Sequence, residues 1–171
     1  MSDRLVDFSY GQIIKIKSTI LNEMKKIAKS NSKKKRYRIC LHDSPDNLQQ
    51  EMIICNVKGD YSRTHKHIGI SETHTIIEGS QLVVLFDDYG KVVDHFIMNR
   101  HEGYLSCRIN AEVYHMSIPL TEFVVVYEVK PGPFKPESNI FPEWAPDGED
   151  ENETRKFINS VLLEISFETI E

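Results

Sequence analysis

The chain lacks the features that would place it in a membrane, in a disulfide-stabilised class or on a nucleic acid. No apolar run approaches the roughly 18 residues that a membrane-spanning helix needs. The three cysteines, Cys40, Cys55 and Cys107, are odd in number and do not have the C-x-x-C spacing of zinc or redox motifs. The net charge is −5 at pH 7, which gives no general attraction to nucleic acid or anionic lipid.

The start of the chain also lacks a targeting signal. Residues 1–4 do not show the basic-then-apolar order of a secretory signal peptide. Together with the unpaired thiols, this predicts a reducing cytoplasm as the location. The basic residues 33–36 are interpreted as a solvated junction rather than a nucleic-acid patch.

What the sequence does contain predicts one globular domain in three segments, since 171 residues with 40% hydrophobic content suit a single core. Residues 1–35 hold an N-terminal helix and a linker, because apolar side chains recur at spacings of three and four over residues 12–28. Residues 36–146 hold short β-rich runs and then a proline-rich wrap, which we expect to lack regular structure because prolines lack backbone donors. Residues 147–171 hold an acidic stretch and a short C-terminal amphipathic helix.

The β-rich runs are separated by turn residues at regular spacing, which is the signal of an all-β sandwich or barrel. About eight strands are predicted, at residues 36–42, 50–57, 72–77, 81–86, 92–98, 104–108, 113–118 and 123–130.

Histidines and a glutamate are concentrated around the second and third of these runs. His65 and His67 are two residues apart, so on a strand both side chains face the same side. A turn containing Gly69 then reverses the chain, and Glu72 begins the next strand beside them. Two imidazoles and a carboxylate suit Fe, Mn, Ni or Zn better than Ca or Mg. The sequence therefore predicts one divalent transition metal.

This passage resembles the first signature of the cupin superfamily, G-x5-H-x-H-x4-E-x6-G, whose positions are filled by Gly59, His65, His67, Glu72 and Gly79. The resemblance implies a jelly-roll barrel, the cupin double-stranded β-helix. The second signature, G-x5-P-x-G-x2-H-x3-N, is only loosely present.

In that second signature Gly103 fits, but Ile109 replaces the proline and Ala111 the glycine. The histidine comes one place late, as His115. We expect His115 to be the fourth ligand, because it lies on a late strand where a barrel closes against the first strands.

Other segments narrow the resemblance to the WbuC-type cupin fold metalloproteins, named for a member encoded among O-antigen polysaccharide genes. They include the sequence around Arg38 and His42, the L-F-D-D-Y-G turn at residues 85–90, E-V-K-P-G-P-F at 128–134 and W-A-P at 144–146. The resemblance implies metal-dependent chemistry on a sugar or sugar nucleotide in surface polysaccharide biosynthesis, with no single reaction fixed.

The residues near the predicted metal suggest roles in that chemistry. His74 shares a strand face with Glu72, so it is a candidate for moving a proton; the alternative for His74 is a hydrogen-bonded core histidine. His42 is the other candidate for moving a proton. The candidate substrate-binding residues are Arg38, Tyr61, Arg63, Glu128 and Lys130. The first hypothesis is an isomerase, epimerase or lyase.

Two alternatives stay open. One is an Fe(II)-dependent dioxygenase, since the same ligands can bind oxygen. The other is a non-catalytic module that binds a small ligand or metal. The expected partner is a small molecule, and a homodimer is expected because open barrel edges tend to be paired.

Overall fold

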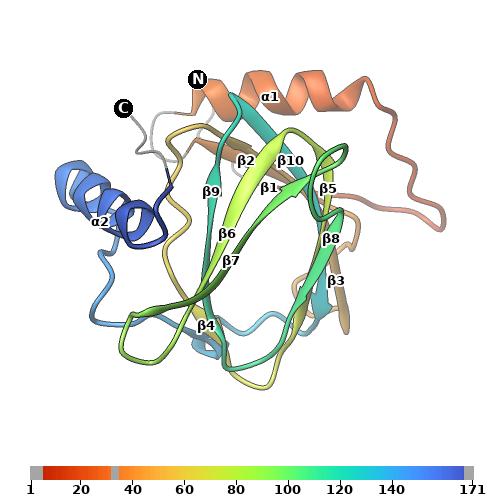
Figure 1. Ribbon diagram of the computed structural model, residues 1–171. Helices are drawn as coiled ribbons and strands as arrows, with labels where there is room; N and C mark the ends of the chain where they lie inside the picture. The colour runs from red at the N-terminus through yellow and green to blue at the C-terminus, as the bar shows by residue number, and fades with distance from the viewer. Residues whose placement is uncertain (1–5, 32–34, 168–171) are drawn as a thin grey trace.

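The computed structural model describes residues 6–31 and 35–167, in which two β-sheets face each other with a helix on each outer side (Figure 1). The helices are α1 (Ile20–Ser30), α2 (Glu151–Glu164) and a short 3-10 helix η1 (Pro136–Ser138). The strands are β1 (Val6–Phe8), β2 (Arg36–Cys40), β3 (Gln49–Val57), β4 (Lys66–His67), β5 (Glu72–Glu78), β6 (Ser80–Phe86), β7 (Val92–Asn99), β8 (Ser106–Ile109), β9 (Tyr114–Pro119), β10 (Phe123–Pro131) and β11 (Asn139–Ile140).

The strands form three sheets with a non-sequential order. The larger sheet runs β1-β2-β3-β10-β5-β8, and the smaller one runs β7-β6-β9. Strands β4 and β11 make a separate two-stranded sheet. The central strand β10 pairs antiparallel with both β3 and β5, so it places residues from the two ends of the barrel sequence side by side.

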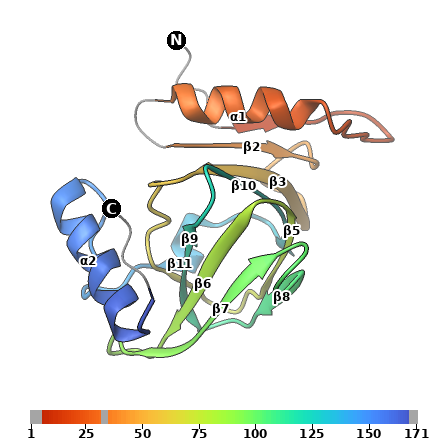
Figure 2. The same ribbon diagram turned by 45° about the horizontal axis from the view of Figure 1, so that its top comes forward.

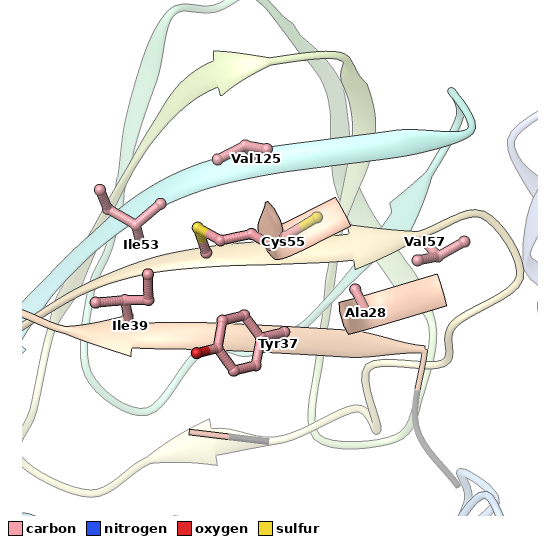
Figure 3. Close-up of a cluster of buried hydrophobic side chains, with 8 residues drawn as sticks. Ala28, Tyr37, Ile39, Ile53, Cys55, Val57 and Val125 are labelled. Atoms are coloured by element: carbon pink, nitrogen blue, oxygen red, sulfur yellow. The ribbon is translucent and has the colours of Figure 1, made fainter. Parts of the chain in front are cut away.

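Helix α1 covers the outer face of the larger sheet, where it lies along β2 and β3 (Figure 2). Its buried residues Met24 and Ala28 pack on side chains that alternate along the strands. Those side chains are Tyr37, Ile39, Ile53, Cys55, Val57 and Val125 (Figure 3). Alternation sends the intervening residues of the same strands into the interior.

Helix α2 lies against the other sheet. Its Val161 and Leu162 join Leu82, Val84 and Met116 in a second apolar cluster. Asp150 accepts hydrogen bonds from the backbone N–H groups of Asn152 and Glu153, and this N-cap begins the helix.

The interior between the sheets is apolar at one end and polar at the other. The apolar end contains Ile76, Val83, Met98, Val124 and Val126, all buried. The polar end contains the histidines and carboxylates described below. Among the described residues, no helix has the length and apolar character needed to cross a bilayer.

The expected N-terminal helix is wrong at its start, because the helix begins at Ile20 and residues 12–19 are not helical. The β-branched residues Ile13, Ile14 and Ile16 favour extended backbone over helix. Ile16 nevertheless packs on the cluster beneath α1, so its apolar spacing reflects burial without helical structure. Residues 32–34 of the expected linker lie outside the described residues.

The eight predicted strands are confirmed, with ends that differ by up to two residues. Three short strands, β1, β4 and β11, were not expected. The expectation that residues 131–146 lack regular structure is corrected, since η1 and β11 lie there. Asn139 and Ile140 are not prolines, so they keep the donors with which β11 pairs with β4.

Candidate metal centre

Four side chains from separate elements meet at the polar end of the interior. His67 belongs to β4, Glu72 is the first residue of β5, and His115 lies on β9. The backbones of His65 and His115 exchange two hydrogen bonds, from His65 N at 3.1 Å and from His115 N at 2.9 Å. The structure therefore brings all four predicted ligands together, in a group that could hold a metal ion.

The distances within this group match the spacing of ligands around one ion. His67 Nε2 is 3.0 Å from Glu72 Oε2, and His115 Nε2 is 2.9 Å from Glu72 Oε1. Ligands about 2.1 Å from a transition metal lie roughly 3.0–3.4 Å from each other in octahedral or tetrahedral geometry. His67, Glu72 and His115 are all buried, so water does not compete for these atoms.

Two imidazoles are fixed in the orientation that a ligand requires. His65 Nδ1 donates to the Arg63 carbonyl at 2.8 Å, and His115 Nδ1 donates to the Val113 carbonyl at 2.9 Å. Because a carbonyl can only accept, these bonds assign the hydrogen to Nδ1 and leave Nε2 with a free lone pair. Burial, and then the neighbouring His115, lowers the pKa of His65 to about 3, so this ring is neutral.

A cation fits this donor set. His115 Nε2 is buried without a hydrogen bond although Glu72 lies 2.9 Å away. A neutral Nε2 lone pair and a carboxylate oxygen at that distance are two acceptors, which repel unless a positive charge lies between them. The residues present therefore suit a divalent ion with nitrogen and oxygen ligands.

A second group of charged side chains borders the first. His74 Nε2 lies 3.2 Å from Glu72 Oε1 and 3.5 Å from Glu128 Oε2, and Lys130 Nζ lies 3.0 Å from Glu128 Oε1. Strand pairing explains the proximity, since Glu128 of β10 is directly opposite His74 of β5. All four side chains face the interior, as their positions on alternate residues predict.

The electrostatics of this second group favour charged forms. Burial opposes ionisation of Glu72, but the neighbouring imidazoles of His74, His115 and His67 hold its pKa well below the usual value. Burial would lower the pKa of His74, yet Glu72 and Glu128 raise it well above its usual value. Burial raises the pKa of Glu128, but Lys130 and His74 together outweigh it and lower the pKa to about 2.

A small cavity lies beside the site. Its volume is about 10 Å³, and its walls include His67, Lys130, Gln50 and Phe134. That volume holds about one water-sized group. The segment after β10 forms one wall and is held by hydrogen bonds from Gly132 N to Leu48 O and from Phe134 N to Pro45 O.

The other predicted site residues lie at different distances from the metal group. Arg38 faces the interior, with Nη1 3.9 Å from Met52 Sδ. Arg63 lies with its guanidinium 4.3 Å from the ring centre of Phe141, which is itself 6.1 Å from the His65 ring. Phe141 is a neighbour of the site that the proline-rich sequence around it gave no signal to find.

Two of the predicted site residues, Tyr61 and His42, contact side chains or backbone outside the metal group. The Tyr61 hydroxyl donates to the Pro146 carbonyl at 3.1 Å, and its ring packs on Phe157. The Nδ1 of His42 lies 3.0 Å from both the N and the O of Glu51, and its ring meets that of Phe8 edge to face.

The backbone explains the imperfect second signature. Counted back from His115, the glycine position falls on Glu112, not on Ala111, and Glu112 has φ of +68°. This is the left-handed conformation that glycine adopts without strain. The Glu112 carboxylate accepts from Gly69 N at 2.9 Å, which ties this turn to the turn between His67 and Glu72.

Comparison with solved structures shows which proteins have a similar fold. The capsular polysaccharide assembling protein CapF from Staphylococcus aureus is similar, with a TM-score of 0.54, 12% identity and coverage of 66% of this chain and 32% of that chain. CapF with the inhibitor 3-isopropenyl-tropolone gives a TM-score of 0.53, 15% identity and coverage of 62% and 31%. The matched region spans about a third of these CapF chains. This chain has a cupin fold.

Sequence comparison adds one family. Residues 16–98 match the model of a domain of unknown function, DUF6016. The matched segment contains His65, His67 and Glu72 but ends before His115. No curated protein sequence matches the chain.

Proposed function

We propose that this cupin binds one divalent transition metal through His65, His67, Glu72 and His115 and acts on a sugar or sugar nucleotide. The convergence of the His67 and His115 Nε2 atoms on the Glu72 carboxylate, with His115 Nε2 lacking a hydrogen bond, carries the proposal. Four protein ligands leave one or two positions for substrate on a five- or six-coordinate metal. We assign the barrel to the double-stranded β-helix of the superfamily and the chain to the WbuC type.

The reaction that we propose is an isomerisation, epimerisation or elimination. A bound metal would supply a Lewis acid for a carbonyl or hydroxyl oxygen of the substrate. Within the chain, His74 is placed to hold and move the proton, because its Nε2 lies 3.2 Å from the ligand Glu72. His42 is the second candidate, since its Nδ1 contacts the Glu51 backbone and its Nε2 is not used in that contact.

The substrate-binding roles follow from charge and position. Glu128 and Lys130 border the metal group, and Arg38 and Arg63 offer guanidinium groups to a phosphate or carboxylate. Tyr61 would contribute from the turn that precedes the ligands. A role in surface polysaccharide biosynthesis is supported by the resemblance to WbuC-type proteins and by the fold shared with a capsular polysaccharide assembling protein.

Metal content per chain tests the site. We expect about one Fe, Mn, Ni or Zn in the parent, and near-complete loss in His65→Ala and His115→Ala. His95→Ala is the matched control, because His95 is exposed on β7, away from the ligand group. A parent that stays empty after incubation with each metal would refute the metal centre.

Turnover tests the reaction. The metal-loaded protein is incubated with nucleotide sugars and the mixture followed by proton NMR, where isomerisation or elimination changes the anomeric signals. Oxygen consumption by the iron-loaded protein would instead establish the alternative Fe(II)-dependent dioxygenase.

The small cavity favours a second candidate function, a non-catalytic module for a small ligand. A space of about 10 Å³ next to His67 does not admit a sugar nucleotide unless the segment after β10 moves. A ligand that raises the melting temperature without any turnover would support this function.

We further propose a cytoplasmic homodimer formed by one-domain chains. The free cysteines suit a reducing compartment, and β1 and β8 are the outer strands of the larger sheet. Light scattering after size-exclusion chromatography measures the mass, and a monomer of 19.8 kDa at micromolar concentration would refute the dimer.

A further inference from the structure

The buried charges around the metal group do not balance once a divalent ion is present. Glu72 and Glu128 carry two negative charges and Lys130 carries one positive charge, so the net charge of these side chains is no lower than −1, the value reached when every imidazole is counted as neutral. A divalent ion therefore leaves at least one positive charge in excess. An uncompensated charge in a buried site is costly, so the site favours an anion at the remaining metal positions.

Lys130 is placed to hold part of that anion. Its Nζ is 3.0 Å from Glu128 Oε1 and 3.9 Å from Glu72 Oε2, and its side chain is 15% exposed. An ammonium group has three N–H donors, and these two ion pairs use at most two of them. The side chain also lines the cavity that reaches the ligand His67.

The cavity has room for only a small group. It has room for about one water-sized atom, which suits a carboxylate oxygen. On the opposite wall, Gln50 Nε2 donates to the carbonyls of Asn47 at 2.8 Å and Pro45 at 3.1 Å. These bonds already use the Gln50 amide to hold a loop. Lys130 and Lys135 are the charged side chains that line the cavity, and Lys130 lies 3.9 Å from the predicted ligand Glu72.

We propose that the substrate carries a carboxylate, one oxygen of which occupies this cavity against Lys130 while its neighbouring oxygen function faces the metal. The substrate class is a small 2-hydroxy or 2-oxo acid, which includes sugar acids. This inference rests on the proposed metal centre and narrows its substrate. Glu128 acts by holding Lys130 in place, and is a positioning residue.

The test measures anion binding to protein loaded with cobalt(II), whose visible absorption changes when a ligand enters the coordination sphere. Metal content is determined first. Glycolate and its neutral analogue glycolamide are then titrated into the parent. We expect saturable spectral change with glycolate and at least about tenfold weaker binding of glycolamide, because a charge-assisted hydrogen bond is lost.

Variants assign the effect to Lys130. Lys130→Met alone would remove the lysine partner of the buried Glu128 and leave only the contact with His74 at 3.5 Å, so the double variant Lys130→Met/Glu128→Gln is included to keep the net charge unchanged. Both should lower the glycolate affinity at least about tenfold while metal content stays unchanged. Lys58→Met is the control, since Lys58 is an exposed turn residue, and it should bind glycolate as the parent does.

The outcomes separate the two proposals. A parent that takes up no metal refutes the proposed function, and this inference with it. A parent that takes up metal but binds glycolamide as tightly as glycolate refutes the carboxylate alone. The same conclusion follows if the metal-loaded double variant binds glycolate as the parent does.

Discussion

The two ends of the barrel interior are built from the same strands but from opposite chemistry. On the inner face of β10, Val124 and Val126 are followed at the same spacing by Glu128 and Lys130. On β5, the inner face runs from Glu72 through His74 to the apolar Ile76. Alternation along a strand decides which side chains enter the interior, but it does not decide whether they are apolar or charged.

The apolar and polar ends of the interior are expected to contribute differently to stability. Burial of the apolar end is favourable in itself, at roughly 25 cal/mol per Å² of apolar surface removed from water. Burial of the polar end costs desolvation, which ion pairs only partly offset. We therefore expect the apolar end to carry the fold and the polar end to depend on a bound cation.

The largest expected effect is the stabilisation of the polar end by metal. A metal at a thousand-fold excess over its dissociation constant raises the free energy of unfolding by about 4 kcal/mol. Denaturant titration with metal and with a chelator measures this difference. His67→Ala should abolish it, and an equal metal effect in that variant would place the bound ion elsewhere.

The next effect comes from the apolar end. Met98→Ala removes a fully buried side chain and should lower the free energy of unfolding by about 3 kcal/mol. Metal content per folded chain should not change, which elemental analysis checks. Met98→Leu conserves volume and is the control, with an expected cost below about 1.5 kcal/mol. Loss of metal in Met98→Ala would show that the two ends are not independent.

A smaller effect is the acid sensitivity of the metal-free polar end. The pKa of Glu128 is lowered from an ordinary 4.5 to about 2. Its ionised form therefore contributes stability above about pH 4.5, and this contribution is lost as the pH falls towards 2. Between pH 6 and pH 3, Glu128→Gln should lose less free energy of unfolding than the parent. Parallel losses in both proteins would contradict the prediction.

The smallest effect is expected from a pair outside both ends. Lys29 Nζ lies 2.7 Å from Glu122 Oε1, with both side chains about two-thirds exposed. Solvent screens such a pair, so Lys29→Met should change the free energy of unfolding by less than about 1 kcal/mol. Urea denaturation measures this, and a larger loss would mean that surface charge contributes as buried charge does.

The predictions from sequence succeeded where local pattern and tertiary structure agree. Strands with alternating burial are confirmed, and the helix at the C-terminus begins at the N-cap Asp150. The expected start of the N-terminal helix at residue 12 is wrong, because the apolar spacing of Ile13 and Ile16 does not outweigh the extended preference of β-branched residues, and the helix begins at Ile20. Strands β1, β4 and β11 are too short to leave a periodic signal.

Within the site, the four proposed ligands and the neighbouring His74, Glu128 and Lys130 could be predicted from the sequence, because motif spacing and strand alternation are local properties. It did not reveal that Phe141 lies near His65, nor that Gln50 closes the cavity by holding a loop. Phe141 and His65 are far apart in the sequence and meet where β11 pairs with β4, which no local pattern encodes. The bond from Gln50 to Asn47 is local, but a hydrogen bond within a loop leaves no periodic signal in the sequence.

The sequence by itself determined the side-chain faces of the strands, the set of side chains predicted to bind a metal and the absence of a strong positive charge, because each follows from residue type and spacing. Only the tertiary structure decided which of these groups meet. It placed Glu72 between two groups of partners, assigned the left-handed turn to Glu112 and limited the cavity to about 10 Å³. Those outcomes depend on the pairing of β10 with β5 and on the return of β11 to β4, since contacts between distant segments are set by packing the whole chain.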